Sequence, residues 1–223
     1  MCVDFKATLN ENIQSDAYPM PTAEEIFAKI GDAKKFAKLD LKSAYSQIAL
    51  DDQAKELSVI NTSKGLFVLN RLQMGMKNAS AIFQKCMEQI LKGLPGVIVY
   101  QDDVMICAKS EGQLQNRISQ VRNRLNQRNV TVNESKCCGS CESLRFLGFT
   151  FSKDGILPDK SLVDKILQVS APSNKSELAS FLGLINYYGR FIPNFSELCA
   201  PLFKLKIVET TRGPNSVRPI LKN

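Results

Sequence analysis

Asp102 and Asp103 are adjacent carboxylates that lie between two short apolar segments of the chain. The segments 96–100 and 104–107 are predicted as strands, so the two acids would occupy the tip of a tight hairpin. At about 4 Å and an effective dielectric of about 20, such a pair repels by roughly 4 kcal/mol, and a divalent cation removes this repulsion. The alternative is an ordinary turn pair, because Asp is a favoured turn residue.

A third acid, Asp40, lies at the end of a predicted strand over residues 36–41. A hairpin tip places at least one carboxylate over the face of a sheet, where an acid from another strand can join it. Three carboxylates that hold two magnesium ions can activate a hydroxyl nucleophile and stabilise the leaving oxygen of an in-line phosphoryl transfer. The residue types therefore indicate a two-metal site at Asp40, Asp102 and Asp103.

Turn residues and hydrophobic spacing predict the elements that position these acids. A helix begins near Thr22, because acids follow in its first turn. Residues 58–69 form a hairpin that turns at 63–65. Another helix extends from an N-cap at Asn78 to a stop at Gly93.

The rest of the chain changes from strands to helices. Apolar residues at i, i+4, i+7 and i+11 predict an amphipathic helix over 111–128, and residues 144–152 are predicted as one strand. Beyond Pro158 the chain is helical, and Asn174 and Glu177 have the spacing of a capping box that opens one helix. A sheet region followed by helices alone indicates an α+β domain with a helical appendage.

Composition favours a folded protein with a polyanionic partner. Lys and Arg number 29 against 22 Asp and Glu, which gives a net charge of +7, and 44% of the residues are hydrophobic. A basic excess suits nucleic acid, because each neutralised phosphate releases condensed counterions. No run of about 18 apolar residues predicts a membrane span, and the acids in the first twenty residues do not fit an ordinary signal peptide.

Three of the seven cysteines, Cys137, Cys138 and Cys141, have a spacing that invites a zinc interpretation. The sequence has no histidine and no second C-x-x-C pair that would complete four ligands. We therefore interpret the cysteines as free thiols in a reducing compartment.

Strings of residues around these acids follow one another in the order of a known set of motifs. Tyr100-Gln101-Asp102-Asp103 is similar to the YxDD box of reverse transcriptases. The other strings are residues 2–6, 39–48, 72–84, 136–137, 146–148 and 181–193. The last string is characteristic of gypsy-type LTR retrotransposons, and the match runs from residue 1 to about Lys206. The chain thus resembles the reverse transcriptase of such an element.

The resemblance implies a metal-binding triad of Asp40, Asp102 and Asp103 that holds two Mg²⁺ ions, with Mn²⁺ able to substitute. The backbone carbonyl of Leu41 would add a ligand. Lys136 matches a lysine that protonates the departing pyrophosphate as a general acid. The alternative for Lys136 is a plain surface lysine.

The resemblance also implies a nucleotide site and a primer grip. Tyr45 matches the family's steric gate, a ring that excludes a ribose 2′-OH by clash, and Gly75 would let the backbone approach the nucleotide. Other nucleotide- and template-side positions are Met74, Lys77, Asn78 and Gln84. The primer-gripping hairpin would contain Phe146, Leu147 and Gly148. The alternative for Tyr45 is an ordinary tyrosine. For Lys77, Asn78 and Gln84 it is a helix with exposed polar residues, and for residues 146–148 it is a plain core strand.

The implied fold is a right-hand polymerase, an α+β fold with an antiparallel-sheet palm, partial fingers and a short helical thumb. The expected boundaries are fingers over 1–35 and 53–70, palm over 36–52 and 71–155, thumb and the start of the connection over 156–206, and a tail without resemblance over 207–223.

The implied activity is RNA-directed DNA polymerisation, in which deoxynucleotides are added to a primer 3′-OH and pyrophosphate is released. The implied partners are an RNA or DNA template, a DNA or tRNA primer, dNTPs and, in a parent polyprotein, protease, ribonuclease H and integrase segments, but no membrane. An active element would work in the cytoplasm in virus-like particles. The alternative is a truncated or degenerate remnant that binds nucleic acid without efficient polymerisation, because the chain begins inside the fingers.

Four residues differ from those usual at their positions in the family's motifs. Gln73 and Met74 replace a Pro and a Phe, Ser80 replaces a Pro, and Gln101 replaces an aliphatic residue. None of these changes removes a predicted metal ligand, but they bear on nucleotide affinity and rate.

Overall fold

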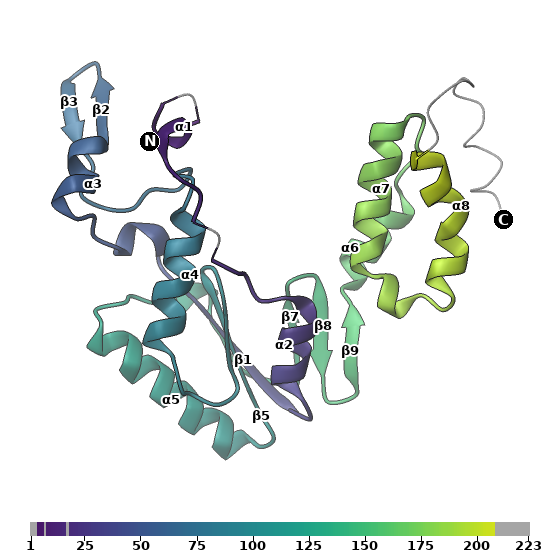
Figure 1. Ribbon diagram of the computed structural model, residues 1–223. Coiled ribbons are helices and arrows are strands. Elements are labelled where there is room, and N and C mark those ends of the chain that lie inside the picture. The colour runs from purple at the N-terminus through teal and green to yellow at the C-terminus, as the bar shows by residue number, and fades with distance from the viewer. Residues whose placement is uncertain (1–3, 7, 17, 208–223) are drawn as a thin grey trace. The chain divides into compact units, whose positions relative to one another are not determined.

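The computed structural model describes residues 4–6, 8–16 and 18–207 (Figure 1). The chain divides into two units. The first consists of Met1–Leu144 and Phe151–Gly155, and the second of Arg145–Thr150 and Ile156–Asn223. Among the described helices, none combines the length and apolar character that a membrane crossing requires.

A four-stranded antiparallel sheet forms the centre of the first unit, with strand order β4-β5-β1-β6. The strands are β1 (Lys35–Asp40), β4 (Val97–Tyr100), β5 (Asp103–Ala108) and β6 (Cys138–Cys141). The predicted strands at 36–41, 96–100 and 104–107 are confirmed to within a residue or so at each end. Strands close in sequence to each predicted acid therefore share one sheet.

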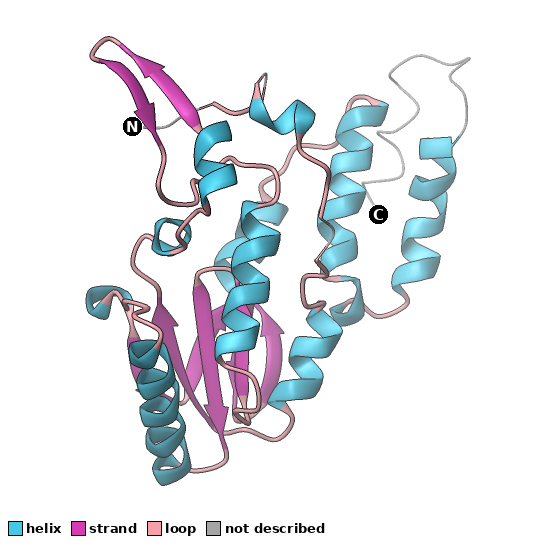
Figure 2. Cartoon of the chain, turned by 60° about the vertical axis from the view of Figure 1, so that its left-hand side comes forward, coloured by secondary structure: helices cyan, strands magenta, loops and turns pink. Residues whose placement is uncertain are grey.

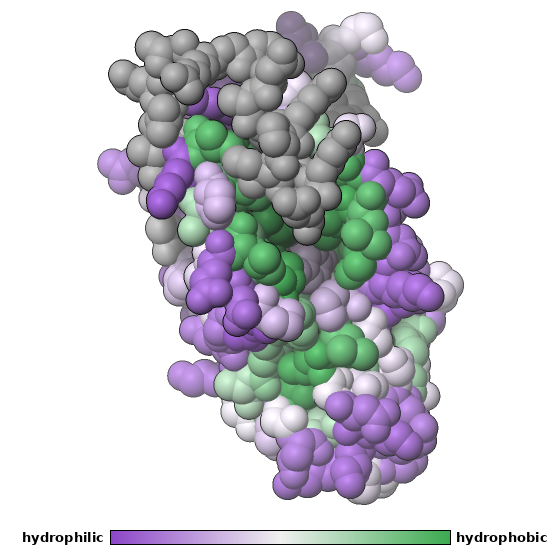
Figure 3. All heavy atoms as spheres, turned by 90° about the vertical axis from the view of Figure 1, so that its right-hand side faces the viewer, coloured by the Kyte–Doolittle hydropathy of each residue, from purple (hydrophilic) through white to green (hydrophobic). Residues whose placement is uncertain are grey.

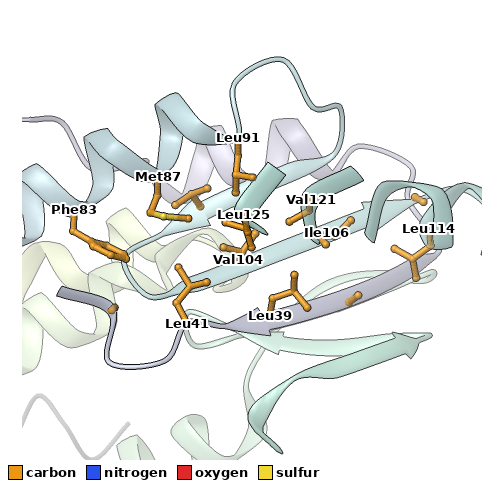
Figure 4. Close-up of a cluster of buried hydrophobic side chains, with 14 residues drawn as sticks. Leu39, Leu41, Phe83, Met87, Leu91, Val104, Ile106, Leu114, Val121 and Leu125 are labelled. Carbon is orange, nitrogen blue, oxygen red and sulfur yellow. The ribbon is translucent and has the colours of Figure 1, made fainter. Parts of the chain in front are cut away.

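Two helices cover one face of this sheet, α4 (Ala79–Ile90) and α5 (Glu111–Gln127). Figure 4 shows the side chains of β1, β5, α4 and α5 pointing toward one another in a single apolar cluster. Leu39, Val104 and Val121 are at most 2% exposed, and burial of such a side chain contributes roughly 1.5–3 kcal/mol. The amphipathic helix predicted over 111–128 is confirmed.

The predicted hairpin at 58–69 is also confirmed, as β2 (Val59–Thr62) and β3 (Gly65–Val68) after a short α3 (Asp52–Leu57). Figure 2 shows this two-stranded hairpin as separate from the four-stranded sheet. The predicted helix after Thr22 is α2 (Ala23–Ile30), and Thr22 and Glu25 form its capping box. The remaining short elements of this unit are α1 (Leu9–Asn12) and the 3₁₀ turns η1 (Ala44–Gln47) and η2 (Glu134–Lys136).

Two predictions about local structure were wrong. Asn78 precedes α4 but its side chain does not cap the helix, because it donates to the Gln14 carbonyl and accepts from the Asp16 amide. Residues 144–152 are not one strand but two, β7 (Ser143–Phe146) and β8 (Phe149–Ser152), which form a three-stranded sheet with β9 (Gly155–Pro158).

The second unit is mainly helical, with α6 (Lys160–Leu167), α7 (Lys175–Tyr187), the 3₁₀ turn η3 (Gly189–Phe191) and α8 (Phe195–Ile207). Buried Leu178, Leu182 and Leu202 hold α7 and α8 together. Other apolar side chains stay exposed in this unit, and green patches are visible on the face drawn in Figure 3. The helical prediction beyond Pro158 is confirmed.

The predicted capping box at the start of α7 is only half formed. Asn174 accepts from the Glu177 amide as expected. The Glu177 carboxylate accepts from the backbone amide and the hydroxyl of Ser173, so it binds one residue before the N-cap.

Two glycines give opposite predictions for stability. Gly96 has φ +66°, and a Cβ there would lie 2.5 Å from the Cys107 carbonyl oxygen, whereas Gly112 lies exposed in α5 with open space around it. Gly96→Ala should lower the free energy of unfolding by about 2 kcal/mol or more. Gly112→Ala, the matched control, should raise it by up to about 1 kcal/mol. Urea unfolding of both variants measures the effects, and equal effects would contradict the packing described around Gly96.

Candidate active site

Asp40 and Asp103 are direct partners across the β1–β5 pair. The neighbouring pair, Leu41 and Asp102, is hydrogen-bonded, because the Leu41 amide donates to the Asp102 carbonyl at 3.1 Å. Hydrogen-bonded and non-hydrogen-bonded pairs alternate along antiparallel strands, so Asp40 and Asp103 form a non-hydrogen-bonded pair. Cα atoms in such pairs are about 4.5 Å apart and their side chains lie on one face. The register of one sheet therefore brings together two of the three predicted acids.

The face that carries these acids is opposite to the apolar core. Residues alternate along a strand, so Leu39 and Val104 enter the cluster under α4 and α5 while Asp40 and Asp103 point the other way. Lys38 lies on the same face as the acids, and its ammonium is 2.8 Å from an Asp103 carboxylate oxygen.

Burial raises the pKa of the Asp103 carboxyl above its ordinary value. The Lys38 ammonium acts in the other direction, while the negative charges of Asp102 and Asp40 add to the rise. The net direction shows that one cation does not offset burial and two neighbouring acids. A divalent cation carries more charge than the Lys38 ammonium and would offset both the burial of Asp103 and its repulsion by the two acids.

Asp102 is exposed in the two-residue turn between β4 and β5. Gln101, the first central residue of this turn, has φ +52°, and Asp102 is not among the residues with positive φ. That pattern matches a type II′ hairpin turn, in which the first central residue is usually Gly. A left-handed conformation costs an ordinary residue about 1–2 kcal/mol, so the turn that bears the acids is strained.

The three carboxylates are near one another along the backbone but not gathered. Among the described residues, no three acidic, thiol or imidazole side chains are placed as a group that could hold a metal ion. The Asp103 carboxylate is paired with Lys38, and Asp102 faces solvent. The donor set itself, hard carboxylate oxygens, fits Mg²⁺, so binding requires Asp103 to exchange its ammonium partner for a metal ion.

The predicted residues Leu41 and Lys136 are both connected to Asp40 through the backbone. Leu41 is buried directly after it, and the Asp40 carbonyl accepts from the Asn133 amide at 2.8 Å. The Asn133 carbonyl in turn accepts from the Lys136 amide, and the Lys136 side chain is exposed. The backbone of β1 thus anchors the segment that carries the predicted general acid.

Tyr45 lies in η1 and is held by two contacts with α4. Its ring packs against Phe83 with centroids 5.3 Å apart, and its hydroxyl is 3.1 Å from the Ser80 hydroxyl. The hydrogen bond depends on Ser80, which replaces the usual Pro of the family. The predicted gate is therefore fixed in place by a residue that departs from the family pattern.

The loop before α4 is attached to the N-terminal segment. Met74 is 72% exposed, Gly75 has φ +95°, and the Gly75 carbonyl accepts from the Asn10 side chain. The Lys77 ammonium donates to the Ile13 carbonyl at 2.8 Å. In this conformation Lys77 holds the N-terminal segment to the loop, in addition to any role toward a nucleotide.

Gln84 does not occupy an open nucleotide surface. Gln84 is 0% exposed. Its side-chain amide hydrogen-bonds the Val99 carbonyl of β4 and the Gln101 amide of the following turn. The structure does not support direct contact between Gln84 and a nucleotide, because no part of the side chain is accessible. Nor is it the exposed polar residue that the alternative predicted.

The predicted primer-grip residues form a tight turn in the second unit. Phe146 is buried, while Leu147 and Gly148 have φ values of +50° and +77°. The Tyr187 hydroxyl donates to the Leu147 carbonyl and the Tyr188 hydroxyl to the Gly148 carbonyl. The two tyrosines of α7 thus fix this turn.

Comparison with known proteins decides the family. The sequence model of the family "Reverse transcriptase (RNA-dependent DNA polymerase)" matches residues 1–151. This chain belongs to the reverse transcriptase family.

Its relatives include retrotransposon polyproteins. The reverse transcriptase chain is 37% identical over 204 residues to the "Retrovirus-related Pol polyprotein from transposon gypsy" of Drosophila melanogaster. It is 35% identical over 207 residues to the "Transposon Tf2-3 polyprotein" of Schizosaccharomyces pombe. These matches cover 91% and 92% of the chain but only 20% and 16% of the polyproteins.

Solved structures show the same right-hand polymerase fold. The foamy viral protease-reverse transcriptase in complex with dsDNA matches with a TM-score of 0.82 and 25% identity, over 94% of this chain and 44% of that one. The same viral protein in complex with RNA/DNA hybrid matches with a TM-score of 0.78 and 25% identity, over 93% and 28%. The predicted fold class is confirmed.

The raised pKa of Asp103 predicts how its removal changes the stability of this reverse transcriptase. An acid whose folded-state pKa is raised contributes stability that is present below its ordinary pKa of 3.8 and is lost as pH rises through the folded-state pKa. Asp103→Asn should therefore raise the melting temperature at pH 7 in EDTA, and the difference should shrink as the pH falls toward 3.8.

The matched control is Asp164→Asn, which changes an exposed carboxylate on α6 and should leave the melting temperature unaltered. Thermal unfolding at several pH values measures both variants. A lower melting temperature for Asp103→Asn at pH 7 would mean that the ion pair with Lys38 outweighs burial.

Proposed function

We propose that this chain carries out RNA-directed DNA polymerisation, the template-directed addition of deoxynucleotides to a primer 3′-OH with release of pyrophosphate. The observation that carries the proposal is the cross-strand pair Asp40 and Asp103, with Asp102 adjacent, in a member of the reverse transcriptase family. We assign residues 1–35 and 53–70 to fingers, 36–52 and 71–155 to palm, and 156–206 to thumb.

Two Mg²⁺ ions are the proposed cofactors, held by Asp40, Asp102 and Asp103 with the Leu41 carbonyl, and Mn²⁺ should substitute. Bound there, the ions would activate the primer hydroxyl and stabilise charge on the leaving oxygens. Lys38 must release Asp103 when a metal binds, and the ammonium then remains nearby as a positive group. Such an exchange would relieve the repulsion that Asp40 and Asp102 exert on Asp103, because a divalent ion carries more positive charge than the ammonium.

The other side chains of the site position the substrate. The Tyr45 ring, fixed by Phe83 and Ser80, would exclude a 2′-OH by clash. Gly75 adopts φ +95°, which suits a close backbone approach. Lys136, on the segment anchored to Asp40, would donate a proton to the departing pyrophosphate.

The proposed partners are a template, a primer and dNTPs. A net charge of +7 supports contact with phosphates, and the foamy viral relatives bind dsDNA or RNA/DNA hybrid. We further propose that the chain works within a Pol polyprotein beside protease, ribonuclease H and integrase segments, in cytoplasmic virus-like particles.

A second candidate is a remnant that binds nucleic acid without efficient polymerisation. Two observations favour it. Among the described residues, the carboxylates are not gathered around a metal position, and the Asp103 carboxylate is paired with the Lys38 ammonium. In this case the ion pair of Lys38 with Asp103 would be a permanent replacement for the metal.

Primer extension on an RNA template with Mg²⁺ or Mn²⁺ distinguishes the two candidates. The wild-type chain should extend the primer. Asp102→Asn should lower the rate by at least about 100-fold, because a ligand of the ions that would stabilise transition-state charge is lost. The control Asp164→Asn should retain the wild-type rate. Template binding without extension by the wild-type chain would reject the polymerase and support the remnant.

Sugar selection tests the role of Tyr45. Tyr45→Ala should lower the preference for dNTP over rNTP by about 10- to 100-fold, because the ring that blocks the 2′-OH is removed. Tyr45→Phe keeps the ring and loses only the hydrogen bond to Ser80, so it should keep most of the preference. Competitive incorporation of dNTP and rNTP gives the ratio, and an unchanged ratio in Tyr45→Ala would exclude Tyr45 as the gate.

A further inference from the structure

Gln84 is a polar residue in an apolar place. It lies on the side of α4 that faces the sheet, near Phe83 and Met87, and it is 0% exposed. A buried amide is costly unless its donors and acceptor are all bonded. The bonds that Gln84 makes therefore indicate what it does in the fold.

The amide binds both ends of a three-residue stretch that leads into the acidic turn. Its nitrogen donates to the Val99 carbonyl at 2.9 Å, and its oxygen accepts from the Gln101 amide at 2.8 Å. β4 is an edge strand, and the bond from the Cys107 amide to the Gly96 carbonyl implies that the Val99 carbonyl points away from β5. Gln84 thus takes the place of a missing neighbouring strand.

Glu88 fixes which way the amide is turned. The Gln84 nitrogen also donates to one Glu88 carboxylate oxygen at 2.7 Å, and the other oxygen accepts from the Tyr18 hydroxyl at 2.5 Å. Val99 and Glu88 both offer acceptors, so the nitrogen must face them and the oxygen is left for the Gln101 amide. The network then runs from Tyr18 through Glu88 and Gln84 to the turn.

The residue at the end of this network is the strained one. Gln101 has φ +52° and directly precedes Asp102 and Asp103. A bond to its backbone amide stabilises one orientation of the peptide that leads into both acids. Without that bond, the turn is free to relax toward a less strained conformation, which would redirect the carboxylates.

We infer that Gln84 is a positioning residue for the turn at Gln101 and Asp102. It holds Gln101 in its left-handed conformation and so orients the carboxylates of Asp102 and Asp103. It acts through the backbone of Val99 and Gln101 and does not touch the nucleotide. The effect on catalysis rests on the proposed polymerase function, but the effect on the turn does not.

Hydrogen exchange tests the inference without requiring activity. Gln84→Met keeps the volume of the side chain and removes its hydrogen bonds. In the folded protein, exchange of the Gln101 amide followed by NMR should become at least about 10-fold faster. Gln89→Met, the same change at an exposed position of α4, should leave this amide unaffected. Equal exchange in Gln84→Met and the wild type would overturn the inference.

Glu88→Ala provides a second variant if Gln84→Met fails to fold. It leaves Gln84 in place and removes the carboxylate that orients the amide, so exchange at Gln101 should rise in the same direction and by a smaller factor. No change in this variant would equally overturn the inference.

Kinetics test whether the turn matters for the reaction. Gln84→Met should lower kcat for primer extension by about 10- to 100-fold and leave KM for dNTP within about twofold. The substitution changes the orientation of the carboxylates and leaves the binding of the nucleotide unchanged. Adding Gln101→Gly should restore part of kcat, since glycine adopts φ +52° without support. A raised KM with unchanged kcat, or no rescue by glycine, would contradict positioning. If the wild type shows no extension, the proposed function fails while hydrogen exchange still decides the inference.

Discussion

The antiparallel register of β1 with β5 is the constraint on which the rest of the structure depends. It sets Asp40 opposite Asp103 and, one residue along, Leu39 opposite Val104. Because side chains alternate, the same register that places Asp40 and Asp103 on one face buries the leucine and valine under α4 and α5. A slip by one residue would turn the charges into the apolar core, so core packing enforces the geometry of the site.

The site reduces the stability of the fold that builds it. Burial and two neighbouring acids raise the pKa of Asp103, and Gln101 is held in a left-handed conformation beside them. Such features persist where the surroundings over-determine them, and they concentrate at functional sites. Lys38 supplies a positive charge on one side, and Gln84 supplies backbone hydrogen bonds on the other. Asp40, Asp102 and Asp103 are thus close along the backbone, and among the described residues their carboxylates are not gathered into one group.

The sequence predicted most elements and the position of the acids, because these depend on local patterns. Apolar strands on both sides of Asp102 and Asp103 and the spacing of α5 are visible in short windows. The failures came from contacts between distant segments. Asn78 bonds residues 14 and 16 and does not cap its helix. The turn at Leu147 and Gly148, which splits one predicted strand, is bonded by two tyrosines of α7. Lys38 was missed for the same reason. Gln84 was assigned to the nucleotide side, although a glutamine on the apolar stripe of α4 was a readable sign of burial.

The position of a bound metal tests the central claim most directly. Crystals of this chain soaked with Mn²⁺ should show anomalous density about 2.1 Å from carboxylate oxygens of both Asp40 and Asp103, with Asp102 within reach of the same ions and the Lys38 ammonium moved away from Asp103. Absence of Mn²⁺ from this face, with Lys38 still paired to Asp103, would contradict the account, because the acids would then share a strand register but no ion.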